Sequence, residues 1–142
     1  MDIMSNFAES IKELIGETKI SEISAKVNIS IPVIYKYLRK ESMPKLHNAV
    51  SLAKYFECTL DYLFGLSDKR ERLNGKELLY DTAFRNVLSE AKCTRYILQK
   101  QTQIPSQSID DWYHGKREPS IPHLIKVASY LGCTLDKLAG LE

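Results

Sequence analysis

The sequence predicts an all-α protein made of two tandem domains, each with about five short helices. The strongest observation is an internal repeat, because CTLDYLFGL starts at Cys58 and CTLDKLAGL starts at Cys133, 75 residues later. No stretch alternates between apolar and polar residues for long enough to be a strand. The same shift of 75 residues aligns Ile34 with Ile109, Pro44 with Pro119, Leu46 with Ile121, Val50 with Ile125, Ala53 with Ala128 and Tyr55 with Tyr130.

Apolar residues recur at helical spacing in both copies, which predicts that one face of each helix packs in a core. The clearest stripes are Leu46, Ala49, Val50, Ala53 and Phe56 in the first copy, and Ile121, Leu124, Ile125, Ala128 and Leu131 in the second. Helix starts are predicted at residues that cap helices well, namely Ser21, Ser30, Thr59, Thr94, Ser120 and Thr134. Gly65 and Gly140 follow the last short helix of each copy and favour helix ends.

A charged segment, DKRERLNGKEL at residues 68–78, separates the two copies and contains the turn dipeptide Asn74-Gly75. We therefore expect a first domain at residues 1–67, a linker at 68–78 and a second domain at 79–142. If residues 69–78 were fully extended, they would span about 33–36 Å.

Composition excludes several classes of function. A net charge of +2 is too small for a polycation that coats nucleic acid, so any DNA contact depends on locally placed charge. The three cysteines lack CxxC spacing, so neither a zinc site nor a disulfide framework is predicted, and no cofactor or small-molecule ligand is indicated. No apolar run is long enough for a membrane span, and the first residues lack the features of a secretory signal. We expect a cytoplasmic protein with no membrane association.

The block QIPSQSIDDWYHGKREPS, residues 103–120, carries the clearest functional signal. It resembles the lambda-repressor-like helix-turn-helix family, also called the Cro type or XRE family, in which a G-K-R-x-P-S turn follows the recognition helix. Ile109 and Trp112 occupy the buried face of that helix. The first copy is similar through NISIPVIYKYLRKESMPKL at residues 28–46, so the resemblance covers nearly the whole chain.

The resemblance implies that one helix of each domain enters the major groove and reads base edges, while the basic turn after it meets phosphates. In the first copy the base-reading positions are Ile31, Pro32 and Lys36, with Tyr35 beside them, and the phosphate positions are Arg39, Lys40 and Lys45. In the second copy they are Ser106, Gln107 and Asp111 for bases, and Arg95, Lys116 and Arg117 for phosphates.

The two sets differ in chemistry. Lys36 can donate to guanine acceptors, and Gln107 can read adenine with two hydrogen bonds. Tyr35 can contact a thymine methyl group or a phosphate. Asp110 and Asp111 bring negative charge towards the phosphate backbone, although Asp111 can accept a hydrogen bond from cytosine. Both aspartates also have a purely structural interpretation, because acids favour the positive N-terminal end of a helix.

Two departures from the family pattern are informative. The buried Arg–Glu pair that is common in the family is replaced by apolar pairs, which we expect to be Ile15 with Leu38 and Leu88 with Tyr113. In the second copy, Gln99 occupies a position that is usually small, and Gln103 occupies one that is usually Gly. These residues suggest a shifted helix pair or a weaker role in DNA binding. Pro105 stands at the usual N-cap of its helix, so Ser106 is expected to cap it instead, one residue later.

The leading interpretation is a transcriptional regulator, with a repressor favoured, that binds double-stranded DNA sequence-specifically through both domains. In the alternative, the chain is an antitoxin or adaptor whose second domain binds a protein partner or forms a homodimer, and only the first domain binds DNA. The pair Asp110 and Asp111, together with Tyr96 and Tyr113 if these are exposed, motivates that alternative. An enzyme is disfavoured, because no nucleophile, base and orienting acid share a recognisable spacing and no Gly-rich phosphate loop is present.

Overall fold

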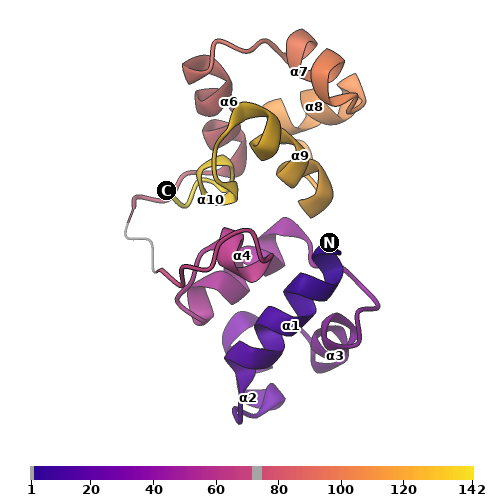
Figure 1. Ribbon diagram of the computed structural model, residues 1–142, viewed down its shortest axis with the longest axis vertical. Coiled ribbons are helices and arrows are strands. Elements are labelled where there is room, and N and C mark those ends of the chain that lie inside the picture. The colour runs from indigo at the N-terminus through magenta and orange to yellow at the C-terminus, as the bar shows by residue number, and fades with distance from the viewer. Residues whose placement is uncertain (1, 72–74) are drawn as a thin grey trace. The chain divides into compact units, whose positions relative to one another are not determined.

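The computed structural model describes residues 2–71 and 75–142, and the chain divides into two compact units, Met1–Leu73 and Asn74–Glu142 (Figure 1). We call them the N-terminal unit and the C-terminal unit. Over the described residues each unit consists of five α-helices without a strand, so the predicted all-α fold is confirmed. The division falls within the segment predicted as the linker. Asn74 of the predicted turn lies outside the described residues.

The N-terminal unit is built around one aromatic side chain of its first helix. Its helices are α1 (Ile3–Ile15), α2 (Ile20–Val27), α3 (Ile31–Leu38), α4 (Leu46–Tyr55) and α5 (Leu60–Leu63). Helix α1 packs on α3 and α5, and α2 packs on α3 and α4. Phe7 is fully buried between the rings of Tyr37, at 5.5 Å, and Phe64, at 5.2 Å. This contact fixes the inner face of α3 and leaves its other face towards solvent.

The C-terminal unit repeats this arrangement. Its helices are α6 (Tyr80–Glu90), α7 (Arg95–Thr102), α8 (Ser106–Tyr113), α9 (Ile121–Leu131) and α10 (Leu135–Ala139). Helix α8 packs on α6 and α7, and α10 packs on α6 and α9. The Phe84 ring meets the buried Trp112 ring edge-on at 6.0 Å, as Phe7 meets Tyr37 in the other unit.

The ring contacts correct the correspondence between the two first helices. Phe7 and Phe84 make the same contact, so Ile11 corresponds to Leu88, and both side chains are buried. The expected match of Ile15 with Leu88 is therefore wrong by one helical turn. The reason is that α1 continues two residues further past Phe7 than α6 continues past Phe84, while four residues connect the first two helices in both units.

Most of the predicted caps are confirmed. The side chains of Thr59, Thr94, Ser120 and Thr134 each accept a hydrogen bond from a backbone N–H in the first turn of their helix, and Ser30 is the N-cap of α3 without such a bond. Two cap predictions are wrong. Helix α2 begins at Ile20, one residue before Ser21, and helix α8 begins at Ser106 directly after Pro105. Both starts lack a side-chain cap, so packing of the helix decides where it begins.

The repeated CTLD motif forms the same joint in both units. The N–H of Cys58 donates to the carbonyl of Ala53, and the N–H of Cys133 donates to the carbonyl of Ala128. None of the three cysteines forms a disulfide bond, and burial raises the pKa of the Cys93 thiol. Within the described residues no group of His, Cys, Asp or Glu side chains could hold a metal ion. No helix described here combines the length and the apolar character needed to cross a bilayer.

Candidate nucleic-acid interface

The two units contain the same helix-turn-helix backbone. Three residues separate α2 from α3, and three separate α7 from α8. The first of them adopts a left-handed conformation in both units, with φ 58° at Asn28 and φ 60° at Gln103. The second, Ile29 or Ile104, is buried. The turn is therefore unchanged in the C-terminal unit, although a Gln stands where Gly is usual.

Different side chains stabilise the two turns. In the N-terminal unit the Ser24 hydroxyl donates to the carbonyl of Ile29 at 2.5 Å. In the C-terminal unit Thr102 takes this role, since its hydroxyl donates to the Leu98 carbonyl and accepts from the N–H of Ile104. Gln99, which replaces Ser24, is partly exposed and lines an open surface cleft with Ser106 and Ile109. Its bulk is thus accommodated at the surface and does not distort the turn.

Helices α3 and α8 each expose one arc opposite their buried face. At about 100° per residue, four positions of each helix fall within an arc of about 140° that faces away from the buried side chains. The α3 arc consists of Ile31, Pro32, Tyr35 and Lys36, all exposed. The α8 arc consists of Ser106, Gln107, Asp110 and Asp111, exposed or partly exposed. The predicted base-reading residues therefore share one face in each unit.

The basic residues predicted for the N-terminal unit lie after the α3 arc. Arg39 is the C-cap of α3 and pairs with Glu41. The hydrogen bond from Arg39, with smaller contributions from the charges of Arg39 and Lys36, lowers the pKa of the Glu41 carboxyl. Lys40 adopts a left-handed conformation with φ 61° and pairs with Glu9 at 3.4 Å. Lys45 is the exposed N-cap of α4.

The α8 arc is held by interactions within its own unit. The Gln107 amide donates to Asp111 Oδ1 at 2.9 Å, and Arg117 Nε lies 3.8 Å from Asp111 Oδ2. Arg117 also donates to the Ser108 hydroxyl at 3.0 Å. Only 19% of the Asp111 side chain is exposed. Gln107, Asp111 and Arg117 therefore form one connected polar network at the surface.

A second acid of the α8 arc holds the arginine that begins α7. Arg95 donates to Asp110 Oδ1 at 3.0 Å, and its guanidinium carbon lies 4.3 Å from the centre of the Tyr113 ring. Such stacking adds cation–π attraction to the ion pair. Lys116 is exposed and follows Gly115, which has φ 70°. Of the three predicted phosphate-binding cations in this unit, two are thus paired with an acid of α8.

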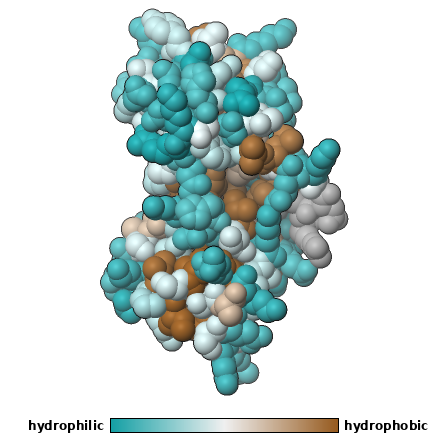
Figure 2. All heavy atoms as spheres, turned by 180° about the vertical axis from the view of Figure 1, so that it is seen from behind, coloured by the Kyte–Doolittle hydropathy of each residue, from teal (hydrophilic) through white to brown (hydrophobic). Residues whose placement is uncertain are grey.

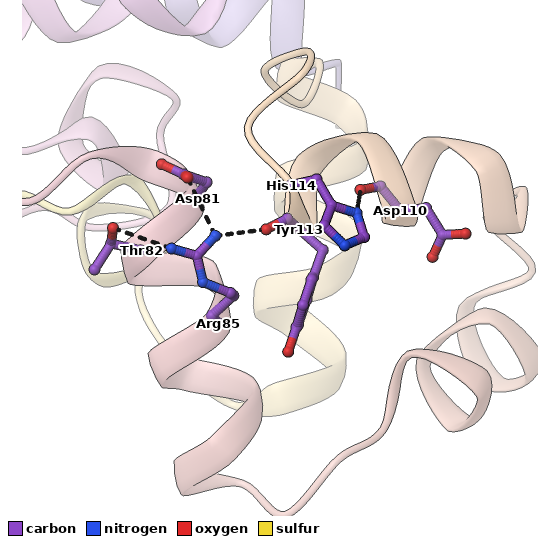
Figure 3. Close-up of polar contacts among 6 residues, drawn as sticks. All are labelled: Asp81, Thr82, Arg85, Asp110, Tyr113 and His114. Atoms are coloured by element: carbon purple, nitrogen blue, oxygen red, sulfur yellow. Dashed lines mark hydrogen bonds and ion pairs between the residues drawn. The ribbon is translucent and has the colours of Figure 1, made fainter.

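Arg85 is a residue that the sequence interpretation missed. It lies on α6 and donates to the carbonyl of Tyr113 at 2.6 Å, to Asp81 at 3.1 Å and to Thr82 at 3.4 Å (Figure 3). Figure 3 shows the guanidinium reaching from α6 to the C-terminal end of α8 beside the Tyr113 ring. A positive charge at this end of a helix is favourable. The available signal was the pair Asp81 and Arg85, four residues apart on one helix face.

Arg85 changes the interpretation of the expected replacement of the family's Arg–Glu pair by Leu88 and Tyr113. Leu88 and Tyr113 line one shallow surface pocket together with Arg85, so the predicted pair does share a site. However, an arginine of the first helix still anchors the end of α8, through a backbone carbonyl and not through a Glu side chain. The contact expected between Ile15 and Leu38 stays a prediction.

The two units carry the same net charge, so they differ in where their charged side chains lie. Residues 1–73 hold eleven basic and ten acidic side chains, and residues 74–142 hold nine and eight. The partners of Arg39 and Lys40, Glu41 and Glu9, lie outside α3. The partners of Arg95 and Arg117 lie on α8 itself. Negative charge therefore sits on the exposed arc only in the C-terminal unit.

Comparison with known protein families agrees with this geometry. Residues 11–63 match the family model described as helix-turn-helix, and residues 83–142 match the Cro/C1-type HTH DNA-binding domain. No curated protein and no solved structure gives a significant match. Domains of this type support the role of a DNA-binding regulator and are typical of proteins without catalytic activity. The chain therefore belongs to the lambda-repressor-like, Cro/C1-type helix-turn-helix family and contains two tandem domains of this type.

Proposed function

We propose that the chain is a sequence-specific transcriptional regulator, with a repressor favoured, whose N-terminal unit is the main reader of double-stranded DNA. The observation that carries this proposal is the α3 arc, where Lys36 is exposed beside apolar side chains and no acid shares the arc. The equivalent α8 arc contains two carboxylates. Such a regulator would act in the cytoplasm.

In the proposed complex, α3 lies in the major groove with its arc towards the base edges. The groove is wide enough to admit a helix, and the Lys36 ammonium can donate to O6 and N7 of guanine. Arg39, Lys40 and Lys45 follow the helix and would contact phosphates of the flanking backbone. The ion pairs of Arg39 with Glu41 and of Lys40 with Glu9 are exposed, so replacing these acids by phosphate as partners costs little free energy.

The C-terminal unit has two candidate roles. In the first, its α8 also enters the groove and Gln107 reads adenine, with Arg95, Lys116 and Arg117 on phosphates. In the second, the unit binds a protein partner or a second copy of the chain, as in an antitoxin or adaptor. The pairing of Arg95 with Asp110 and of Arg117 with Asp111 favours the second role, because both acids lie on α8 itself and would bring negative charge towards the phosphate backbone.

The connection between the units limits how far apart they act. Arg70 donates to the carbonyl of Phe56 at 2.7 Å, and the N–H of Leu78 donates to the carbonyl of Gly140 at 2.8 Å. With both residues held, the chain between Arg70 and Leu78 spans at most about 26–29 Å.

We propose the domain boundaries 1–67 and 79–142, with residues 68–78 as the linker. Unequal arcs on the two units predict a non-palindromic site for a monomer.

Selection from random double-stranded DNA with the full chain, at two salt concentrations, tests this proposal. We expect one enriched sequence and an affinity that falls by about 0.9 log unit per log unit of salt for each phosphate neutralised. A perfectly palindromic sequence would instead point to a homodimer with one reading unit per chain. Absence of an enriched sequence would refute sequence-specific binding, and absence of a salt dependence as well would refute DNA binding altogether.

A further inference from the structure

The α3 arc is mostly hydrocarbon, although it faces solvent. Ile31 is 40% exposed and Tyr35 is 43% exposed, and they lie four residues apart on neighbouring turns. Pro32 is exposed beside them and Lys36 closes the arc. Figure 2, which views one face of the molecule, shows brown apolar areas interrupting a largely hydrophilic surface.

The fold does not require these apolar side chains. The core side of α3 is already supplied by Ile34 and Tyr37, which are 1% and 2% exposed. The C-terminal unit forms the same helix-turn-helix with Ser106 and Asp110 at the positions of Ile31 and Tyr35. The duplication therefore acts as an internal control, and it indicates that the hydrocarbon on the α3 arc serves an interaction.

The major groove offers one apolar group to such a surface, the C5-methyl group of thymine. We infer that the α3 arc selects thymine, with Ile31 and Tyr35 burying thymine methyl groups beside the base pair contacted by Lys36. This inference rests on the proposed DNA-binding function and names part of its sequence preference. Ile31 and Pro32 are stiff side chains, so ordering them against DNA costs little conformational entropy.

The charges around the arc favour DNA over a protein as its occupant. Lys36 belongs to the arc, and Arg39, Lys40 and Lys45 follow it along the chain. A protein partner would have to bury or neutralise these cations, whereas the phosphates on either side of a groove neutralise them directly. When DNA phosphates neutralise these cations, the apolar groups that remain within reach of the α3 arc in the major groove are thymine methyl groups.

The test compares thymine with uracil, which pairs identically but lacks the methyl group. Fluorescence anisotropy would measure binding of the full chain to a labelled duplex of the selected sequence, and to duplexes with single thymines replaced by uracil. We expect one or two replacements to lower the affinity about fourfold each, the value for one buried methyl group. In the variant Ile31→Ala, the sensitivity to at least one of these replacements should disappear.

Matched variants separate this role from others. Ile97→Ala removes an apolar side chain of similar exposure, 41%, from α7 of the C-terminal unit and should keep the full sensitivity to uracil. Tyr35→Phe should also keep it, because the ring remains. If Tyr35→Phe instead binds thymine and uracil duplexes with equal affinity, the ring alone does not bury a methyl group and the role assigned to it is wrong.

Two results would overturn the inference, and they are distinguishable. A selected sequence whose affinity is unchanged by every uracil replacement overturns the thymine assignment but leaves the proposed DNA-binding function intact. Absence of any selected sequence overturns both. In the first case, concentration-dependent self-association that Ile31→Ala abolishes would assign the arc to a contact between two copies of the chain.

Discussion

Arg95 donates a 3.0 Å hydrogen bond to Asp110 while its guanidinium stacks 4.3 Å from the centre of the Tyr113 ring. The cation at the start of α7 is thus bound to an acid of the helix expected to face DNA. In the N-terminal unit, Tyr35 occupies the position that corresponds to Asp110, and Ile20 occupies the one that corresponds to Arg95. This relationship accounts for the proposed difference between the units better than net charge does.

Asp110→Asn should therefore strengthen DNA binding. The variant releases Arg95 for a phosphate and removes a repelling carboxylate, so the affinity should rise roughly two- to fivefold. The slope of log affinity against log salt should steepen by about 0.9. Glu90→Gln is the matched control, since it breaks the 2.9 Å pair with Lys137 and changes the net charge equally. If both variants raised the DNA affinity equally, the gain would come from the change in net charge and not from the release of Arg95.

Lys40 adopts a left-handed conformation at a position where the C-terminal unit has Gly115. Lys40→Gly should raise the free energy of unfolding by about 0.5–1 kcal/mol, because Gly adopts this conformation without steric cost. It should also weaken DNA binding and lower the salt slope by about 0.9, because a phosphate contact is lost. Chemical denaturation and anisotropy measure the two effects.

Glu57→Gly is the control for that variant. Glu57 has φ 54° and its counterpart Gly132 has φ 68°, so the same relief of backbone strain is expected. No phosphate contact is assigned to Glu57, and its replacement should not weaken DNA binding. If both variants leave the affinity unchanged, Lys40 does not contact phosphate and belongs among the solvated surface residues.

Arg85→Ala should destabilise the C-terminal unit. The variant removes the hydrogen bond to the Tyr113 carbonyl at the end of α8, and we expect a loss of about 1–2 kcal/mol. The pair with Asp81 adds little, because 37% of the Arg85 side chain is exposed. Chemical denaturation monitored by fluorescence of the single tryptophan, Trp112, reports this unit. An unchanged midpoint would show that Arg85 does not hold α8.

His123 should make stability depend on pH. Burial beside the Trp112 ring, with smaller contributions from Lys126 and Arg117, lowers the pKa of His123 below its ordinary 6.5. The folded state therefore resists protonation, so the stabilisation is present above pH 6.5 and is lost as the pH falls through the lowered pKa. His123→Asn, which installs the residue found at position 48, should reduce the loss of stability between pH 7.5 and 5. An equal loss in both proteins would contradict this assignment.

The fold could be predicted from the sequence because its determinants are local and repeated. The 75-residue repeat, the apolar spacing and caps such as Thr59 and Thr134 specify five helices in each unit. Errors arose where tertiary packing decides. Ser21 lost its predicted role because α2 begins at Ile20, and the register of α1 depends on which ring Phe7 contacts.

The site could be predicted only to the level of which residues share a face. The family resemblance named Gln107 and Asp111 as base-reading positions, and the structure has both on one arc of α8, as their spacing of four residues requires. Spacing did not reveal that Asp111 also meets Arg117, or that Arg85 reaches the end of α8, because long side chains choose partners according to the three-dimensional arrangement. Those partners are what distinguish the two units.

The central claim, that the N-terminal unit is the main reader of DNA, is tested most directly by comparing Lys36→Ala with Gln107→Ala in the full chain. Selection from random DNA would be repeated with each variant. We predict that Lys36→Ala loses the preference at one base position, at a cost of about 1–3 kcal/mol, while Gln107→Ala leaves the selected sequence nearly unchanged. A changed sequence with Gln107→Ala and an unchanged one with Lys36→Ala would contradict the claim.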